Sequence, residues 1–127
     1  MPKILGIDYG SKRIGLAITD QRQEIVFPYL TLENNKFAFD ELKKICVKED
    51  IKKIIIGLPL GLNSSETEKT KEAKNFINLL KKNSGVEVIS FDERLTTRMA
   101  ERFLKDYKDE TSAMIILQDY LLKVGND

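Results

Sequence analysis

Four carboxylates stand at the ends of expected structural elements, where side chains from distant parts of a chain can meet. Asp8 closes the first apolar run, Asp92 and Glu93 follow the last strand-like run, and Asp109 opens the last helical segment. Carboxylates that converge repel one another, and a hard divalent cation such as Mg²⁺ or Mn²⁺ relieves that repulsion through its preference for oxygen ligands. A pair of such ions can activate water and stabilise the leaving oxygen of a phosphodiester. The pattern therefore indicates metal-assisted hydrolysis.

The sequence contains no histidine and a single cysteine, Cys46. The absence of histidine excludes Ser-His and Cys-His hydrolases, His/Cys zinc sites and ribonucleases that use imidazole as a general base. Cys46 shares helical spacing with Phe39 and Leu42, which predicts a place in the core. Hydrolytic chemistry must then rest on carboxylates, lysines or bound metal.

The charges nearly balance, with 21 Lys and Arg against 20 Asp and Glu. A nucleic acid would therefore have to be held by a local basic patch rather than by the field of the whole molecule. Lys12 and Arg13 occupy the first turn, and Arg98, Arg102 and Lys105 form a stripe along an expected helix. Both groups also fit a simpler interpretation, as solvated hairpin and helix charges.

The first third of the chain predicts three strands joined by short turns. The apolar runs cover residues 3–8, 13–19 and 24–32, and the intervening turns contain Gly10 and Asp20. Successive strands with short connections form an antiparallel meander. Pro28 favours an edge position or a bulge for the third strand.

The remainder alternates helices and strands. Amphipathic periodicity predicts a helix over residues 36–49 and another that a Ser65-x-x-Glu68 capping box opens. Continuous apolar strands cover 53–57 and 86–91, and two helices follow at 96–107 and 109–122. The order βββαβαβαα predicts an α/β domain over residues 1–127, with a mixed five-stranded sheet and helices on its faces.

This sheet would bring the carboxylates to one place. If the first strand is central, the carboxyl ends of the first and fifth strands face a common crevice, where open α/β sheets bind ligands. The last helix could deliver Asp109 to the same crevice. Taken singly, each residue also has a structural explanation: Asp8 as a turn residue, Asp109 as an N-cap, and Asp92 and Glu93 as a solvated loop. Residue patterns alone leave these alternatives open.

Four segments resemble motifs of the YqgF/RuvX family. The segment Gly6-Ile-Asp-Tyr-Gly-Ser-Lys-Arg-Ile-Gly-Leu-Ala17 is similar to its opening pattern G-x-D-x-G-x-K-R-I-G-x-A, and Ile56-Gly-Leu-Pro-Leu60 to its central strand. Asp92-Glu-Arg-Leu-Thr-Thr97 resembles D-E-R-[LF]-[ST]-[ST], and Asp109-x-x-Ser-Ala-x-x-Ile-Leu-Gln118 resembles its closing helix. The motifs occur in the family's order and span nearly the whole chain.

The resemblance implies an RNase H-like fold and a metal-dependent nuclease that uses Mg²⁺ or Mn²⁺. Its catalytic and metal-binding carboxylates fall on Asp8, Glu93 and Asp109, and its phosphate-contacting positions fall on Lys12, Arg13 and Arg94. Arg98 and Arg102 extend the expected nucleic-acid surface. The implied substrates are the 5′ end of pre-16S rRNA, in ribosome biogenesis, and Holliday-junction DNA.

Two other functions fit parts of the sequence. Asp8-x-Gly10 followed by a turn resembles the first phosphate loop of actin-like and sugar-kinase-like phosphotransferases, but a single domain leaves no room for the second domain that closes over ATP. A nucleic-acid-binding ribosome-assembly factor with little catalysis is the other alternative. No apolar run is long enough to cross a bilayer and no secretory signal is evident, so we expect a cytoplasmic protein.

Overall fold

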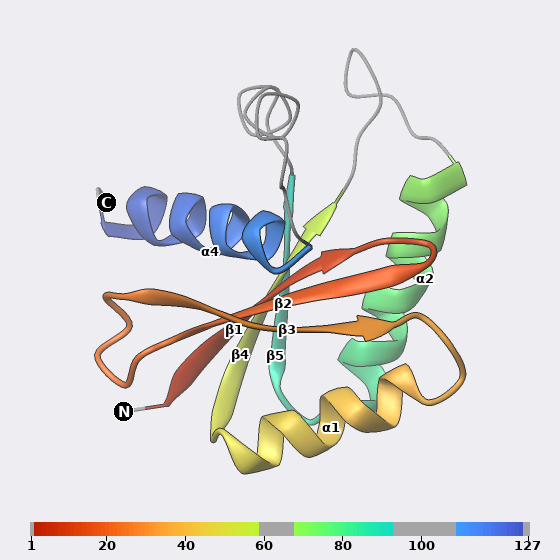
Figure 1. Ribbon diagram of the computed structural model, residues 1–127, viewed down its shortest axis with the longest axis horizontal. Coiled ribbons are helices and arrows are strands. Elements are labelled where there is room, and N and C mark those ends of the chain that lie inside the picture. The colour runs from red at the N-terminus through yellow and green to blue at the C-terminus, as the bar shows by residue number, and fades with distance from the viewer. Residues whose placement is uncertain (1, 59–67, 93–108, 126–127) are drawn as a thin grey trace.

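The computed structural model describes residues 2–58, 68–92 and 109–125 (Figure 1). Their elements are, in chain order, β1 (Lys3–Tyr9), β2 (Arg13–Thr19), β3 (Val26–Glu33), α1 (Ala38–Lys48), β4 (Ile51–Leu58), α2 (Glu68–Asn83), β5 (Glu87–Asp92) and α4 (Asp109–Gly125). The predicted helix over 96–107 and the capping serine at position 65 lie outside these residues. Within the described ranges, no helix has the length and apolar character needed to span a membrane.

The strands form one mixed sheet in the order β3-β2-β1-β4-β5. β1 pairs with β2 and β2 with β3 in antiparallel fashion, whereas β4 runs parallel to both β1 and β5. The predicted meander, the two parallel strands and the central first strand are all confirmed. β3 is the edge strand expected from Pro28. Its register with β2 shifts between Leu16 and Ala17.

Several element boundaries differ from the prediction by one to three residues, and local side-chain hydrogen bonds accompany two of these differences. β3 begins at Val26 rather than at residue 24, since the Asp20 carboxylate accepts the backbone N–H groups of Glu24 and Ile25 at 2.9 and 3.2 Å. α1 begins at Ala38 rather than at residue 36, and Asn35 Oδ1 accepts the N–H of Phe37 at 2.9 Å ahead of it. Short polar side chains thus satisfy backbone donors that would otherwise continue the strand or the helix.

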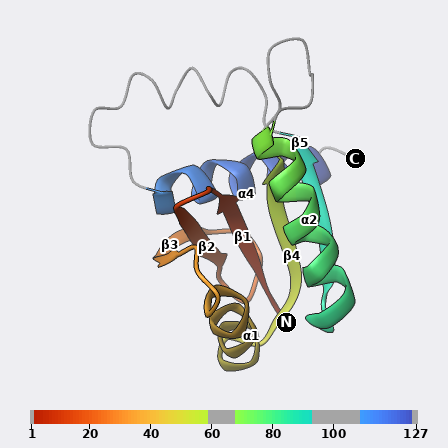
Figure 2. The ribbon, with the colours of Figure 1, turned by 90° about the vertical axis from the view of Figure 1, so that its right-hand side faces the viewer.

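Helices cover both faces of the sheet. Leu5 and Ile7 of β1 belong to a core that includes α1 and α2, whereas Ile4, on the opposite face, packs with residues of α4. Both views place strands β1 to β3 between α4 and α1 (Figures 1 and 2). Cys46 is buried in the larger core as predicted, and this burial raises the pKa of its thiol.

A small polar network links the end of α1 to two strands of the sheet. Glu49, which follows α1, accepts hydrogen bonds from Lys3 Nζ at 3.1 Å and from Tyr29 Oη at 3.0 Å. The bond from Lys3, followed by the one from Tyr29, lowers the pKa of Glu49 below its ordinary value of 4.5. One carboxylate therefore ties α1 to β1 and to the edge strand β3.

We expect Glu49→Gln to lower the free energy of unfolding by about 1 kcal/mol at pH 7, the usual size of a partly exposed charge-assisted contact. Because the folded pKa lies below the unfolded one, the ionised group stabilises the fold above about pH 4.5 and loses that effect as pH falls through the folded pKa. Urea unfolding at pH 7 and pH 3 should therefore show that the difference in unfolding free energy between variant and wild type is smaller at pH 3. A difference of constant size would contradict the role of the charge. The exposed Glu41, which pairs with Lys44 at 3.6 Å, provides the control Glu41→Gln.

Candidate active site

Asp8 lies within β1, one residue before the strand ends, and is paired on both sides. Its register partners are Gly15 on β2 and Gly57 on β4. Register partners point to the same face of a sheet, so the carboxylate is flanked by two positions that carry no side chain. The residue is half-buried. Glycines beside a strand residue allow another backbone or a ligand to approach it closely.

The close approach of α4 to β1 shows to which face of the sheet the Asp8 side chain points. A Cβ on Gly6 would lie 3.0 Å from Cβ of Leu117 and 3.1 Å from the carbonyl oxygen of Ala113, so α4 crosses β1 at this glycine. Asp8 follows Gly6 by two residues and therefore points to the same face as α4. Sequence reasoning placed Gly6 in a motif without identifying this contact.

The direction of α4 places Asp109 toward the carboxyl ends of the parallel strands. Near the other end of the helix, Tyr120 Oη accepts a hydrogen bond from Lys53 Nζ at 3.4 Å, and Lys53 is in register with Glu87 at the start of β5. Ala113, which meets β1 at Gly6, follows Asp109 by one helical turn. The helix start thus lies on the face and at the end of the sheet where Asp8 is found.

β5 ends at the same end of the sheet as Asp8. Gly57, the partner of Asp8, is in register with Phe91, and Leu58 with Asp92. The last residue of β5 is therefore one register step beyond the row that contains Asp8. Glu93 comes next in the chain and lies outside the described residues, as do Arg94, Arg98 and Arg102.

The turn after β1 carries Lys12 and Arg13, two residues predicted to contact phosphate, at this end of the sheet. Gly10 is required there, because an added Cβ would lie 2.5 Å from the carbonyl oxygen of Arg13. Asn34, at the end of β3, donates from Nδ2 to the Gly10 carbonyl at 2.8 Å and from its backbone N–H to the Lys12 carbonyl at 2.9 Å. Lys12 and Arg13 are exposed. Sequence reasoning missed Asn34, since an asparagine after a strand is an ordinary turn signal.

The structure thus brings Asp8, the start of α4 and the turn with Lys12 and Arg13 to one end of the sheet. Among the side chains that it describes, no three Asp, Glu, His or Cys groups are arranged to hold a metal ion. The side chain of Asp109 is not among those described. The predicted triad of Asp8, Glu93 and Asp109 therefore stays a prediction.

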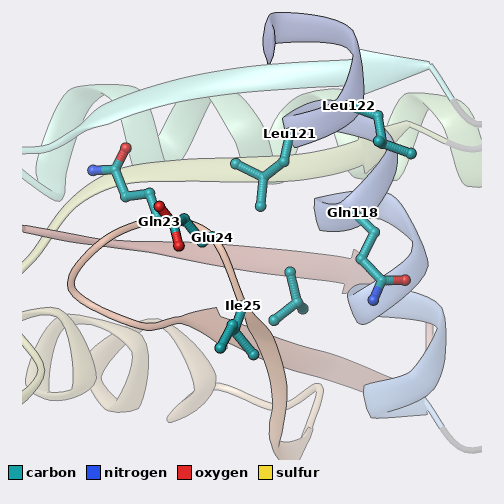
Figure 3. A pocket seen from close by; sticks show the side chains of 7 residues that line it. Gln23, Glu24, Ile25, Gln118, Leu121 and Leu122 are labelled. Carbon is teal, nitrogen blue, oxygen red and sulfur yellow. The ribbon is translucent and has the colours of Figure 1, made fainter.

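The other end of α4 carries a hollow of about 610 Å³ (Figure 3). The turn between β2 and β3 contributes Ile25 and its neighbours, and α4 contributes Gln118, Leu121 and Leu122. This hollow lies beside the C-terminal half of the helix, away from Asp109. It is separate from the edge that carries Asp8.

Comparison with known sequences decides the family. The sequence profile of RuvX, described as Holliday junction resolvase, matches residues 2–123. The chain belongs to the RuvX (YqgF) family. A relative from Endomicrobium trichonymphae is 40% identical over 95% of this chain and 96% of its own length, and one from Malacoplasma penetrans is 36% identical over 94% and 93%. Both are named as candidate pre-16S rRNA nucleases.

Comparison with solved structures confirms the RNase H-like fold. Thermus thermophilus RuvC, in a complex with a Holliday junction substrate, superposes with a TM-score of 0.62 over 98% of this chain and 97% of that one, at 11% sequence identity. At this identity the likeness concerns the fold alone. RuvX membership and the α/β architecture predicted from sequence are both confirmed.

Proposed function

We propose that this RuvX protein is a metal-dependent nuclease that hydrolyses phosphodiester bonds in structured nucleic acid, with the 5′ end of pre-16S rRNA as its substrate. The observation that carries the proposal is Asp8, a half-buried carboxylate between two glycines at the carboxyl edge of the sheet, facing the helix that begins at Asp109. The names of its relatives support the rRNA substrate. We place its activity in the cytoplasm.

The donor set fits Mg²⁺ or Mn²⁺. Asp8 offers oxygen ligands, and its register partners on both neighbouring strands are glycines, so no side chain from those positions competes with a cation. When bound, the metal supplies an activated water and stabilises the leaving oxygen. In this proposal Asp8 binds the metal, Glu93 binds it and orients the attacking water, and Asp109 completes the site. Lys12, Arg13 and Arg94 contact phosphates, and Arg98 and Arg102 extend the contact surface.

We expect Lys12→Ala to weaken nucleic-acid binding, because one phosphate contact is lost. For duplex DNA, the magnitude of the slope of log affinity against log salt concentration should fall by about one. Lys12 is exposed, and no side-chain partner for it occurs within the described ranges. Binding titrations at several salt concentrations measure both quantities. Lys52→Ala is the matched control, since Lys52 is 68% exposed at the amino end of β4. An unchanged slope for Lys12→Ala would remove this residue from the phosphate contacts.

The function itself is tested by digesting pre-16S rRNA leader and four-way junction DNA side by side with Mg²⁺ and with Mn²⁺. Metal-dependent cleavage of the RNA is expected. The family description favours a second candidate, Holliday junction resolution, which cleavage of the junction alone would support. Binding of either substrate without cleavage by either metal would contradict the nuclease and leave a nucleic-acid-binding assembly factor.

A further inference from the structure

An exposed aromatic ring lies three residues after Asn34, which is hydrogen-bonded to the turn that carries Lys12. Phe37 lies between β3 and α1 and is 57% exposed, although the ammonium of Lys36 sits 5.2 Å from the centre of its ring. The segment that holds it follows the end of β3 in Figure 1. More than half of the surface of Phe37 is exposed, so the part of its ring that Lys36 does not cover is available to a ligand.

The backbone beneath this ring is fixed. The N–H of Phe37 donates to Asn35 Oδ1 at 2.9 Å, and its carbonyl accepts the N–H of Glu41 at 3.0 Å. Three residues earlier, Asn34 makes the two hydrogen bonds to the Gly10–Lys12 turn described above. A ring on a rigid backbone loses little conformational freedom when a ligand covers it, which favours binding.

The ring is also within reach of the candidate active site. Gly10 follows Asp8 by two residues, or about 7 Å of strand. The three residues from Asn34 to Phe37 can span at most about 11 Å. Because α1 covers the face of the sheet opposite α4 and Asp8, a nucleic-acid strand that contacts both Asp8 and Phe37 has to cross the end of the sheet at the Lys12 turn.

We propose that Phe37 is a stacking platform for an unpaired base of the nucleic-acid substrate, next to a phosphate contact at Lys12. The inference rests on the proposed function and specifies its substrate class further. Stacking on aromatic side chains contributes to single-strand binding with little sequence preference, because every base has a π-face. Bases inside a duplex already have both faces covered by neighbouring bases. The platform thus favours RNA with unpaired segments over fully paired junction DNA.

The charges around the ring support stacking over simple attraction of phosphate. Asp40 and Glu41 occupy the first turn of α1 after Phe37, and Glu41 pairs with Lys44 at 3.6 Å. These carboxylates offset Lys36, so the immediate surroundings of the ring are not strongly basic. The contribution of Phe37 should therefore be independent of salt, in contrast to that of Lys12.

The lack of tryptophan in the chain permits a direct test. Phe37→Trp places a single indole on the platform, and Phe27→Trp places one on β3 at the opposite end of the sheet, where Phe27 is 47% exposed. Each variant is titrated, without divalent metal, with single-stranded RNA, with blunt duplex and with an abasic strand of equal length. We expect single-stranded RNA to quench the fluorescence of Phe37→Trp strongly, and blunt duplex and the abasic strand to quench it weakly. Phe27→Trp should respond to none of them.

A second measurement uses Phe37→Ala, with Phe27→Ala as the control. Loss of one base stack should weaken binding of single-stranded RNA about tenfold, with the same salt slope as wild type. Equal affinity for wild type and Phe37→Ala, or equal quenching by the RNA and abasic strands, would overturn the platform. If wild type cleaves RNA and Phe37→Ala binds it equally well, the platform alone fails. Wild type that binds no RNA would overturn both the platform and the proposed function.

Discussion

Asp8→Asn should abolish metal-dependent cleavage, with a loss of roughly a thousandfold or more, the scale expected when the main stabilising group of a charged transition state is removed. Asparagine has nearly the same shape, so packing between Gly15 and Gly57 is retained. The amide carries no charge, however, and is a much weaker ligand for a hard cation. Cleavage rates with Mg²⁺ and Mn²⁺ measure this loss.

The same substitution should leave the melting temperature without metal unchanged or slightly raised. Carboxylates that gather without a cation repel one another, and neutralising one of them removes part of that repulsion. A clear fall in melting temperature would mean that Asp8 is a structural residue. With metal present, wild type should gain stability through binding and the variant should gain less.

Asp20→Asn is the matched control for this experiment. Asp20 sits in the turn between β2 and β3, at the opposite end of the sheet, and its carboxylate accepts two backbone N–H groups. These bonds lower its pKa, so the charge stabilises the fold above the ordinary value of 3.8 and that effect is lost as pH falls through the folded pKa. Asp20→Asn should therefore cost some stability at neutral pH and retain full cleavage, the reverse of the pattern for Asp8→Asn.

Much of this architecture could be predicted because it depends on local patterns. Alternating apolar residues and short turns define the meander, and continuous apolar runs such as that in β4 indicate strands buried on both faces. The family motifs then identified the fold and the candidate carboxylates. Taken singly, the pattern around Asp8 favours a turn residue, whereas its pairing on both sides shows that it belongs to the strand.

The remaining features depend on contacts between residues that are far apart in the sequence. The glycines beside Asp8 are 7 and 49 positions away from it, and only the register of the sheet brings them together. Asn34 is held against Gly10 by a hydrogen bond across 24 residues. Periodicity gives the face of a residue but not its partner on another strand, so neither arrangement could be read from the sequence.

A substitution at the contact between β1 and α4 should have the second large effect, on both stability and cleavage. Gly6→Val should lower the free energy of unfolding by about 2–3 kcal/mol, toward the upper end of what overpacking costs. Valine favours strands, so β1 itself is not harmed. The added Cβ, however, would lie 3.0 Å from Cβ of Leu117 and 3.1 Å from the carbonyl oxygen of Ala113. Neither atom can turn away, because both are fixed by the helix, and α4 must move as a body.

That movement should also reduce cleavage. α4 begins at Asp109, and a displacement of about 1 Å at a reacting centre can cost about a hundredfold in rate. Urea unfolding and cleavage rates, measured at a temperature where the variant remains folded, give the two effects separately. Gly6→Ala, which adds the Cβ alone, should show a smaller loss of both stability and rate.

Gly85→Ala separates this effect from a general loss of stability. Gly85 has a φ of +74°, and an added Cβ would meet nothing within 4 Å. Alanine there costs about 1–2 kcal/mol of backbone strain without moving any neighbour. Because Gly85 lies between α2 and β5, far along the chain from α4, the folded Gly85→Ala protein should cleave at the wild-type rate. If Gly6→Val also cleaves at that rate once folded, α4 does not position the site, and Asp109 loses its proposed role.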